Sequence, residues 1–482
     1  MVGLWENSLG GRYHIWKDGK SNILDFRLRL SIIGSMSTTL FRFRQDLRLI
    51  DNTGLIETIK KCLYLVPVFI FDTDTLSQFD QPDTRMSFLI DSIIHLEDQL
   101  RSYWHTLIIR VGSARQIIPA IITEYKCDTL SYNRSYWLGS LQRDKELKQR
   151  CHEQHIHHDV YDDYLLVEPH MIPARKVFTP FFKLRSSITK SPLSMHHNFG
   201  IKQYDTLKSI HDRPSIKQMY NYNTQSRRPI DGWKTRLNHD MSNYTTSRNQ
   251  LDHDGTTQLS VYIRFWLVSI RQVYRNFFYR NTPGDQTIIS ELAWREFWHH
   301  IMYHFPETWL TSFQSKRRSI VRQHNPHLLE ARKTWQTGYP IIDAAMIQLK
   351  QENWMHNRAR MIVASFLTKD LLIDRVQWEK HFSNLLLDYD ACVNIWNRQR
   401  SASVGADPKP LRIFSPILQA QRFDPQAHYI KTYLPQLSHI PAHQLHDPLT
   451  YTLDYIPPIV DHVEMSKKAK EMYRGEHSHS IL

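Results

Sequence analysis

The chemically most suggestive residues of this chain are polar side chains set among apolar, helix-like segments between residues 337 and 394. This stretch begins TGYPIIDAAM, in which Pro340 occupies the place of a first helical residue and apolar residues follow at helical spacing. Buried helices seldom carry several polar groups unless a ligand satisfies them. We therefore expect a ligand site formed by Trp354, His356, Asn357, Arg358, Arg360, Asp388 and Asp390.

A second candidate is the loop at 255–260, with the sequence GTTQLS. Its hydroxyl groups, together with backbone N–H groups at the start of a helix, would suit a pyrophosphate. The same residue types also form an ordinary helix N-cap, and on the residues alone that interpretation is favoured. The loop therefore supports a phosphate site only in combination with other motifs.

An α/β segment in the first part of the chain and a helical segment in the second part must position these groups. The first part of the chain alternates short apolar runs with helix-length segments such as 83–103, which predicts a doubly wound parallel α/β sheet. No GxGxxG motif follows the first strand, so the standard dinucleotide fingerprint is absent. The expected strands are 39–43, 65–71, 106–111 and 128–132, and the expected helices of the second part are 286–303, 340–351, 356–373 and 376–387.

The length of 482 residues exceeds one ordinary core, so we expect two domains. Between them lies a polar segment rich in Ser, Asn, His, Lys and Arg, in which VFTPFF at 177–182 is an apolar island. The expected divisions are a poorly ordered extension at 1–36, an α/β domain at 37–170, a connector at 171–250 and a helical domain at 251–482.

The composition favours a polyanionic partner. The chain has 61 Lys and Arg against 48 Asp and Glu, a net charge of +13, and 27 His. Nucleic acid is the first expected partner and an acidic membrane surface the second, although many soluble proteins are mildly basic without either. The four cysteines form no CxxC pair, so we expect neither a metal site nor a disulfide framework, and a reducing, cytoplasmic location. No apolar run is long enough for a membrane span, and residues 1–35 lack the pattern of a signal peptide.

Several motifs in a fixed order carry a family resemblance. They are LFRFRQDLRLIDNTGL at 40–55, YDDYLLVEP at 161–169, KVFTPFF at 176–182, ELAWREFW at 291–298, TGYPIIDAAM at 337–346, WMHNRARM at 354–361, SFLTKDLLID at 365–374 and RIFSPILQAQRFDP at 412–425. Over most of its length the chain resembles the DNA photolyase/cryptochrome family, in detail its class I cyclobutane pyrimidine dimer photolyases (deoxyribodipyrimidine photo-lyases). DYDAC at 388–392 is also similar to DASH-type cryptochromes.

The resemblance implies a fold, a cofactor and a partner. The expected fold is an α/β antenna domain followed by an all-helical domain that holds FAD at the base of a DNA-facing pocket. The expected partner is DNA that contains pyrimidine dimers, with the protein acting as a monomer associated with the nucleoid.

The resemblance assigns one set of residues to FAD. Arg360 and Asp388 match an ion pair beside the isoalloxazine, where a fixed positive group would stabilise an anionic reduced ring. Asp390 matches a residue that hydrogen-bonds the flavin, and Asn394 matches the residue that faces its N5 atom. Gln258 stands where the phosphate loop usually has Arg, so one phosphate contact is expected to be weak. Without the family, the acidic residues would be interpreted as a structural salt bridge and a solvated helix end. The other matched cofactor residues are Tyr244, Thr256, Thr257, Leu259 and Ser260.

A second matched set would contact DNA and the damaged bases. An aromatic face replaces the stacking that a flipped base loses, and polar groups read the base edges. Glu291 and Trp294 share a helix face because they are three residues apart, and so do Asn357 and Met361, four apart. Core packing is the alternative interpretation of Trp294. The expected catalytic residues are Glu291, Asn357, Met361 and Asn394, and the expected further DNA contacts are Arg248, Arg358 and Arg400.

Four family tryptophans are arginines in this chain. The resemblance places Arg322, Arg375 and Arg398 at the positions of an electron relay to the flavin, and Arg400 on a wall of the lesion pocket. Arginine keeps a fixed charge and is no practical electron donor. On a helix Trp378 points ~60° away from Arg375, whereas Trp396 points ~200° away from Arg398, so Trp378 is the better candidate substitute.

Two further positions depart from the family. Trp266 stands where a glycine is common, so we expect crowding at that point. The folate-contacting Asn-Glu pair of the family is Gly139 and Ser140 here, so we expect an antenna folate (methenyltetrahydrofolate) to bind weakly or not at all.

Three functions stay open on the sequence. The favoured one is light-driven repair of cyclobutane pyrimidine dimers by electron transfer from reduced FAD, because the matched lesion contacts occur together and in order. The alternative is a cryptochrome-like or degenerate flavoprotein that binds FAD and DNA without repair, which the arginines at relay positions favour. The third is a flavin-free nucleic-acid-binding protein, which the substitutions at Gln258 and Trp266 favour.

Overall fold

In the computed structural model the described residues are 37–76, 83–103, 105–194, 228–318, 336–406, 411–451 and 454–475, together with three short strands. These are β1 (Trp16–Lys17), which pairs antiparallel with β2 (Lys20–Ser21), and β8 (Lys202–Gln203). The expected N-terminal extension at 1–36 and much of the expected connector lie outside the described residues.

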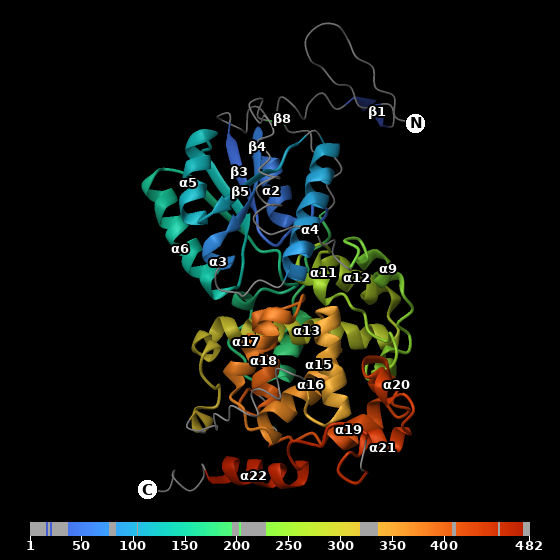
Figure 1. The fold of residues 1–482 in the computed structure, drawn as a ribbon. Helices are drawn as coiled ribbons and strands as arrows, with labels where there is room; N and C mark the ends of the chain where they lie inside the picture. Colours follow the sequence, from blue (N-terminus) through green and yellow to red (C-terminus); the bar gives the residue numbers. More distant parts are fainter. Residues whose placement is uncertain are drawn as a thin grey trace.

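A parallel sheet forms the first half of the described chain (Figure 1). Its strands run in the order β5-β4-β3-β6-β7, so the strand order reverses between β3 and β6, and β8 pairs with β4. The four predicted strands are confirmed, and β7 is an additional edge strand whose polar sequence HHDVY gave no apolar signal. The strands are β3 (Thr38–Phe43), β4 (Tyr64–Asp72), β5 (Ile108–Gly112), β6 (Thr129–Asn133) and β7 (His157–Tyr161).

Helices cover both faces of this sheet. Successive strand residues point to opposite faces, and the apolar side chains on each face are buried under helices. Leu40 belongs to the core that includes Ile118 and Ile121 of α5, whereas Phe41 belongs to the core that includes Phe88 of α4. The helices of this half are α2 (Thr53–Lys61), α3 (Thr73–Leu76), α4 (Asp83–Ser102), α5 (Ala114–Glu124) and α6 (Leu138–Glu153).

The rest of the described chain is helical. The site is positioned by α7 (Phe178–Ser187), α10 (Tyr244–Ser247), α11 (Ser260–Arg264), α12 (Ile270–Arg280), α13 (Pro283–His304), α15 (Pro340–Glu352), α16 (Asn357–Ser365), α17 (Arg375–Leu385), α18 (Ala391–Ser401) and α19 (Pro416–Phe423). The other helices are α9 (Trp233–Asn238), α20 (His428–Tyr433), α21 (Ala442–His446) and α22 (His462–Gly475). Four short 3-10 turns are η1 (Pro169–Met171), η2 (Pro306–Trp309), η3 (Ser315–Arg317) and η5 (Pro435–Leu437).

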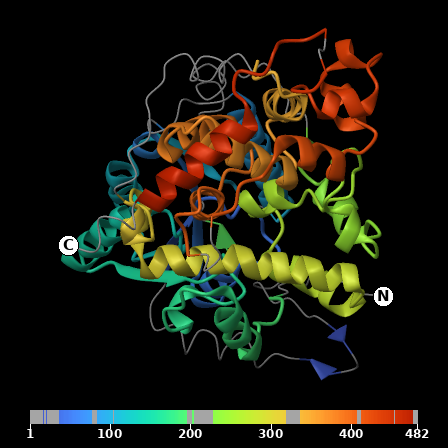
Figure 2. The same cartoon turned by 90° about the horizontal axis from the view of Figure 1, so that it is seen from below.

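The long helix α13 crosses the helical half and packs against α7, α10, α12 and α18 (Figure 2). Its start is fixed by Pro283 in the first turn and by a capping box in which Thr282 and Asp285 bond each other's backbone N–H groups. The two halves share one core, since Phe88 of α4 lies 4.8 Å from Phe265, which follows α11. The sheet and the helices therefore hold each other in place.

The prediction of a single helix at 356–373 was wrong for the second half of that range. The α-helix α16 ends at Ser365 and is followed by a π-helical turn, η4 (Phe366–Asp370). The buried ammonium group of Lys369 donates to the carbonyl of Ala402 over 2.8 Å, and Asp370 pairs with His462. The apolar spacing of the sequence does not reveal these polar partners, and the π-helical turn coincides with them.

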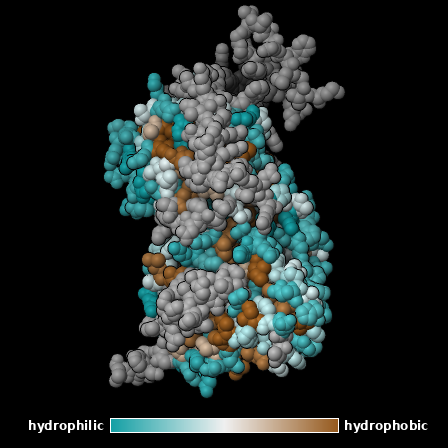
Figure 3. Space-filling view, viewed as in Figure 1, coloured by the Kyte–Doolittle hydropathy of each residue, from teal (hydrophilic) through white to brown (hydrophobic). Residues whose placement is uncertain are grey.

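Hydrophilic residues cover most of the coloured surface in one view, with hydrophobic residues in small separate patches (Figure 3). Among the helices that the structure describes, none has the length and apolar character needed to traverse a bilayer.

Candidate cofactor and nucleic-acid site

An ion pair joins the half-buried Arg360 of α16 to the buried Asp388, which precedes α18. Arg360 Nη2 donates to Asp388 Oδ2 over 2.8 Å and to Oδ1 over 3.1 Å, and Asp388 is nearly inaccessible to solvent. The Arg360 Nε donates to the carbonyl of Met355 over 2.8 Å, which fixes the guanidinium in α16. This pair is the one predicted from the sequence, and its geometry supplies a fixed positive group for an anionic ring.

Asp390 and Asn394 start the next helix. Asp390 is the N-cap of α18, where its carboxylate accepts from Val393 N over 3.3 Å. Asn394 N donates to the carbonyl of Asp390 over 2.8 Å, so the half-buried Asn394 side chain sits one turn into the helix. Asp388 lies in the turn before α18, whereas Asp390 and Asn394 belong to the start of that helix.

The Asp390 carboxylate has partners that the sequence reasoning missed. Tyr164 OH donates to Asp390 Oδ2 over 2.5 Å, and His299 Nε2 lies 3.3 Å from the same oxygen. Burial disfavours the charged ring, but Asp390 outweighs that effect and raises the pKa of His299 to about 10. Burial likewise opposes the Asp390 charge, yet His299 and Arg295 hold the pKa of that carboxyl far below its usual range. Tyr164 stands in the motif at 161–169 and His299 directly follows the motif at 291–298, so only the fold brings them to Asp390.

His299, Asp390 and Cys392 also meet the distance requirement for a metal site, with ligand atoms within 4.8 Å of one another. The chemistry opposes this use. A protonated His299 has no lone pair on Nε2 for a cation, and Arg295 lies 4.0 Å from the Asp390 carboxylate. We interpret the cluster as an ion pair. All four cysteines are buried and free.

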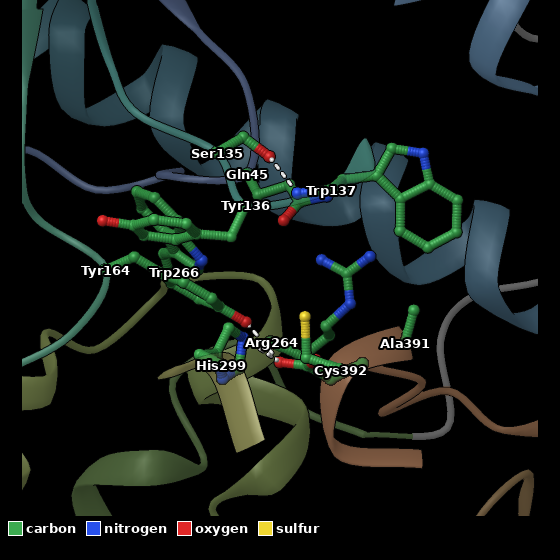
Figure 4. Close-up of a pocket in the computed structure, with 11 residues that line it drawn as sticks. Gln45, Ser135, Tyr136, Trp137, Tyr164, Arg264, Trp266, His299, Ala391 and Cys392 are labelled. Atoms are coloured by element: carbon green, nitrogen blue, oxygen red, sulfur yellow. Dashed lines mark hydrogen bonds and ion pairs between the residues drawn. The ribbon is translucent and has the colours of Figure 1, made fainter. Parts of the chain in front are cut away.

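A small cavity of about 30 Å³ opens beside this ion pair, between the loop after β6 and the start of α18 (Figure 4). Tyr164 and Trp266 line it as a stacked pair, with ring centroids 4.6 Å apart and planes at 19°. Trp266 has φ +47°, a left-handed conformation that glycine adopts without strain, which fits the family's glycine at this position. The remaining lining residues include Gln45, Tyr136, Trp137, Arg264 and Cys392.

The expected folate contacts stand at the start of α6. Ser140 is buried, and its hydroxyl accepts from Arg143 Nη2 over 3.0 Å. The hydroxyl is therefore occupied by the protein, which agrees with weak folate binding; that expectation stays a prediction.

The loop at 255–260 leads into the first turn of α11 and packs closely against Ser247. A Cβ atom at Gly255 would lie 2.6 Å from the carbonyl oxygen of Ser247, so only glycine fits there. Thr256 and Thr257 are half-buried, and Ser260 is exposed at the first turn of α11. Leu259 N donates to Thr257 Oγ1 over 3.4 Å. The residues present fit a pyrophosphate in type and placement.

Arg228 places a positive charge beside Gln258, the residue that stands where the family's loop usually has arginine. Its Nη1 donates to Gln258 Oε1 over 2.9 Å, while Gln258 Nε2 donates to Asp254 over 2.7 Å. Sequence reasoning missed Arg228 because it stands in a polar segment that carries no motif. A guanidinium beside the loop can bind a phosphate from there.

Tyr244 and Glu291, expected at the cofactor and the lesion, bond directly to each other. Tyr244 OH donates to Glu291 Oε2 over 2.6 Å, and Arg248 pairs with the other carboxylate oxygen. These bonds tie α10 to α13. One residue of the expected cofactor set and one of the expected lesion set are therefore in direct contact.

Three of the remaining expected DNA contacts stand on α16, whereas Trp294 is on α13 and Arg400 is on α18. Asn357 is exposed at the first position and Met361 is half-buried one turn later. Arg358 donates to Asn249 Oδ1 over 2.5 Å, and its guanidinium lies 4.2 Å from the ring of Phe423 in α19. The N-cap is His356, whose Nδ1 accepts from Arg358 N over 3.1 Å.

The arginines at relay positions have different surroundings. Arg398 is buried and forms an ion pair with Glu379 over 2.9 Å, with its guanidinium 6.0 Å from the ring of Trp378. Arg375 begins α17, but its side chain and all of Arg322 lie outside the described residues. Trp396 is fully buried and stacks on Trp298 with centroids 5.8 Å apart, which turns it away from Arg398 as expected.

Comparisons with known proteins agree with this geometry. Residues 39–196 match the family model described as DNA photolyase, and residues 288–475 match the one described as the FAD binding domain of DNA photolyase. A deoxyribodipyrimidine photo-lyase of Alkalihalophilus pseudofirmus is 32% identical over 90% of this chain and 97% of its own length. That of Escherichia coli is 30% identical over 91% and 99%.

Solved structures give the same result. An archaeal photolyase from Sulfolobus tokodaii with two FAD molecules has a TM-score of 0.83 at 28% identity, covering 91% of this chain and all of that one. A bacterial class III photolyase from Agrobacterium tumefaciens has a TM-score of 0.78 at 27% identity, over 92% and 98%. The chain belongs to the DNA photolyase/cryptochrome family. Its fold is the two-part fold of that family, and its cofactor is FAD.

Proposed function

We propose that the protein repairs UV-induced cyclobutane pyrimidine dimers in DNA, using light-driven electron transfer from reduced FAD to a flipped-out dimer. The observation that carries the proposal is the buried Arg360–Asp388 pair beside Asp390 and Asn394, with the lesion-contacting set on the adjoining helices. DNA is the proposed partner, in line with the net charge of +13, and a monomer is the proposed acting unit.

FAD, when bound, supplies the light-absorbing electron donor. Arg360 holds a fixed positive charge that favours the negatively charged form of its ring, and Asp388 keeps that guanidinium in place. Asn394 would present its amide to the N5 edge. Thr256, Thr257 and Arg228 would hold the phosphates, with Arg228 in place of the usual loop arginine.

The helices α13 and α16 would receive the damaged bases. Trp294 offers an aromatic face, and Glu291 and Asn357 offer polar groups for the base edges. Arg248 and Arg358, on neighbouring elements, would contact the DNA backbone. These roles require no tryptophan relay, since the repair step needs only a reduced cofactor close to the dimer.

The relay substitutions affect how the cofactor becomes reduced. Arg398 occupies its position with a charge that Glu379 neutralises, and neither group donates an electron readily. We propose that light reduces the bound cofactor slowly in this protein and that repair depends on an external reductant.

The alternative is a flavoprotein of this family that binds FAD and DNA without repair. One observation favours it: the guanidinium of Arg400 lies 4.8 Å from the ring of Trp294, in the proposed lesion pocket. If Arg400 stays in contact with the Trp294 ring, a base cannot stack at that position.

The test is a repair assay that bypasses photoreduction. The protein is loaded with FAD, reduced chemically without oxygen, mixed with dimer-containing oligothymidine and irradiated with near-UV or blue light. Chromatography should show loss of dimers in the light and none in the dark, and Glu291→Ala should repair more slowly. Intact dimers after prolonged irradiation of the reduced, FAD-loaded protein would favour the alternative.

A further inference from the structure

Cys392 lies in the first turn of α18 and lines the small cavity beside the His299–Asp390 ion pair. A ring nitrogen of His299, the Cys392 sulfur and a carboxylate oxygen of Asp390 lie within 4.8 Å of one another. Figure 4 shows the sulfur pointing into the cavity, which the guanidinium of Arg264 also enters. The thiol therefore shares an open space with two cationic groups.

The charges around this thiol favour its deprotonated form. His299 is protonated beside Asp390, and Arg295 lies 4.0 Å from the same carboxylate, so positive charge outweighs the one negative charge. Arg264 adds a further positive charge, and the backbone N–H groups at the start of α18 carry partial positive charge. The thiolate is the reactive form of cysteine, and both cations and helix N-termini stabilise it.

The cavity has the size and the lining of a site for a small oxygen compound. Its volume is about 30 Å³, whereas one water molecule needs about 10–15 Å³, so two bonded oxygen atoms fit. The buried Trp266 lines the cavity, and its indole N–H has no hydrogen-bond partner among the described residues. This donor, His299 and Arg264 suit an oxygen acceptor. Because Cys392 is only 4% exposed, a bulky reagent cannot reach the sulfur.

The other three cysteines have different surroundings. Cys62 packs in one apolar core, and Cys127 and Cys151 pack in another. Burial raises the pKa of Cys62 and that of Cys127 to about 12, and it also raises the pKa of Cys151. Cys392 packs against a core as well, but of the four cysteines only Cys392 lines the cavity. The other three are therefore expected to react slowly.

We propose that Cys392 is an oxidant-sensitive site, at which hydrogen peroxide converts the thiol to a sulfenic acid. The thiolate sulfur attacks one peroxide oxygen, so that an S–O bond forms while the O–O bond breaks. The sulfur gives up two electrons to the peroxide, and the leaving hydroxide takes a proton from His299 and departs as water. His299 then regains the proton that the thiol released. One thiol and one peroxide thus yield one sulfenic acid and one water.

Oxidation of Cys392 acts on the neighbouring ion pair. The new oxygen accepts a hydrogen bond from His299, which weakens the 3.3 Å contact between His299 Nε2 and Asp390 Oδ2. Asp390 is a proposed contact of FAD, so oxidation weakens cofactor binding. This link to the cofactor rests on the proposed function, whereas the oxidation of Cys392 does not.

The first test follows the oxidation of each cysteine in the FAD-loaded protein, kept in the dark. Hydrogen peroxide is added, catalase removes it after set times, and the protein is unfolded in dimedone, which labels sulfenic acids. Peptide mass spectrometry then measures the label on each cysteine. We expect Cys392 to be labelled about tenfold faster or more than Cys62, Cys127 and Cys151. Equal or slower labelling of Cys392 would overturn the proposal.

Two variants test the surroundings of the thiol. His299→Gln removes a cation and should slow the labelling of Cys392 about threefold or more, whereas Trp266→Phe removes only an N–H group and should slow it less. The matched control is His300→Gln, which changes the next buried histidine of α13, outside the cavity, and should leave the rate unchanged. Unfolding curves check that each variant is folded. If neither His299→Gln nor Trp266→Phe slows the reaction, the cavity does not activate the thiol and the proposal fails.

The third measurement is the affinity for FAD before and after treatment with peroxide, with Cys392→Ser as the matched control. Oxidation should weaken FAD binding by the wild type about two- to tenfold, as expected for a weakened charge-assisted hydrogen bond, and should leave Cys392→Ser unchanged. The same affinity for oxidised and reduced wild type would overturn the link to the cofactor. If neither form binds FAD, the proposed function fails, while labelling of the apoprotein still decides whether Cys392 is the reactive cysteine.

Discussion

Arg398 and Glu379 form an ion pair in the interior of the helical half, with Arg398 Nη1 2.9 Å from Glu379 Oε2 and the arginine only 2% exposed. Glu379 also accepts a hydrogen bond from Tyr389 OH over 2.7 Å. The arginine that stands at a family tryptophan position is therefore paired with an opposite charge. Buried charges are tolerated only when paired in this way.

The first prediction concerns this pair. Arg398→Leu leaves the Glu379 carboxylate buried without its countercharge and should lower the free energy of unfolding by about 3–5 kcal/mol. The double variant Arg398→Leu/Glu379→Leu removes both charges and should recover most of that loss. Urea unfolding of the single and double variants measures both quantities. A single variant as stable as the wild type would show that the pair contributes nothing to the fold.

The second prediction is a pH dependence that comes from His299. Its pKa is about 10 in the folded protein, against about 6.5 when unfolded, because Asp390 favours the charged ring. The stability from this pair is therefore complete below about pH 6.5 and is lost as the pH rises toward 10. In that range His299 should contribute a fall of up to about 1.4 kcal/mol per pH unit in the free energy of unfolding.

The comparison that isolates this effect is His299→Gln, which cannot carry the charge. Its free energy of unfolding should fall less steeply between pH 6.5 and 10 than that of the wild type, measured by denaturant titration at each pH. Parallel curves for the two proteins would contradict the proposed charge on His299. Other buried groups titrate in both proteins alike, so they cancel in the difference.

The third prediction tests Arg228 as the phosphate-binding cation. Arg228→Ala should weaken FAD binding about tenfold or more, as expected for loss of a charge-assisted hydrogen bond. Adding Gln258→Arg returns a guanidinium to the loop and should restore most of the affinity. Fluorescence titration of apoprotein with FAD measures each constant. If Arg228→Ala binds FAD as the wild type does, the charge beside Gln258 has no part in cofactor binding.

The strands and long helices were predictable from the sequence because each carries an apolar period of its own. Pro340, followed by Ile341, Ile342 and Ala345, defined the start of α15 correctly. The edge strand β7 and the π-helical end at Phe366–Asp370 were missed, because polar partners elsewhere in the fold determine them.

The candidate site shows the same division. Arg360 and Asp388 were predicted from motifs, and the structure pairs them. Asn394 lies in the first turn of the helix that Asp390 caps. Tyr164 and His299 contact Asp390, which lies 226 and 91 positions further along the chain. Arg228 contacts Gln258, which lies 30 positions further along. Contacts over such separations leave no local pattern in one sequence.

The fourth prediction addresses FAD itself. Asp388→Asn keeps the shape of the side chain but removes the charge that holds Arg360, so FAD affinity should fall about tenfold or more. Asp98→Asn, an exposed aspartate on α4, is the matched control and should bind FAD as the wild type does.

The most direct measurement of the central claim is the affinity and stoichiometry of FAD binding to purified protein, followed by flavin absorbance. The account predicts a yellow protein that binds equimolar FAD, with binding weakened by Asp388→Asn and unaffected by Asp98→Asn. A protein that takes up no FAD at saturating concentration, or one whose affinity is the same with and without the Asp388 charge, would contradict it.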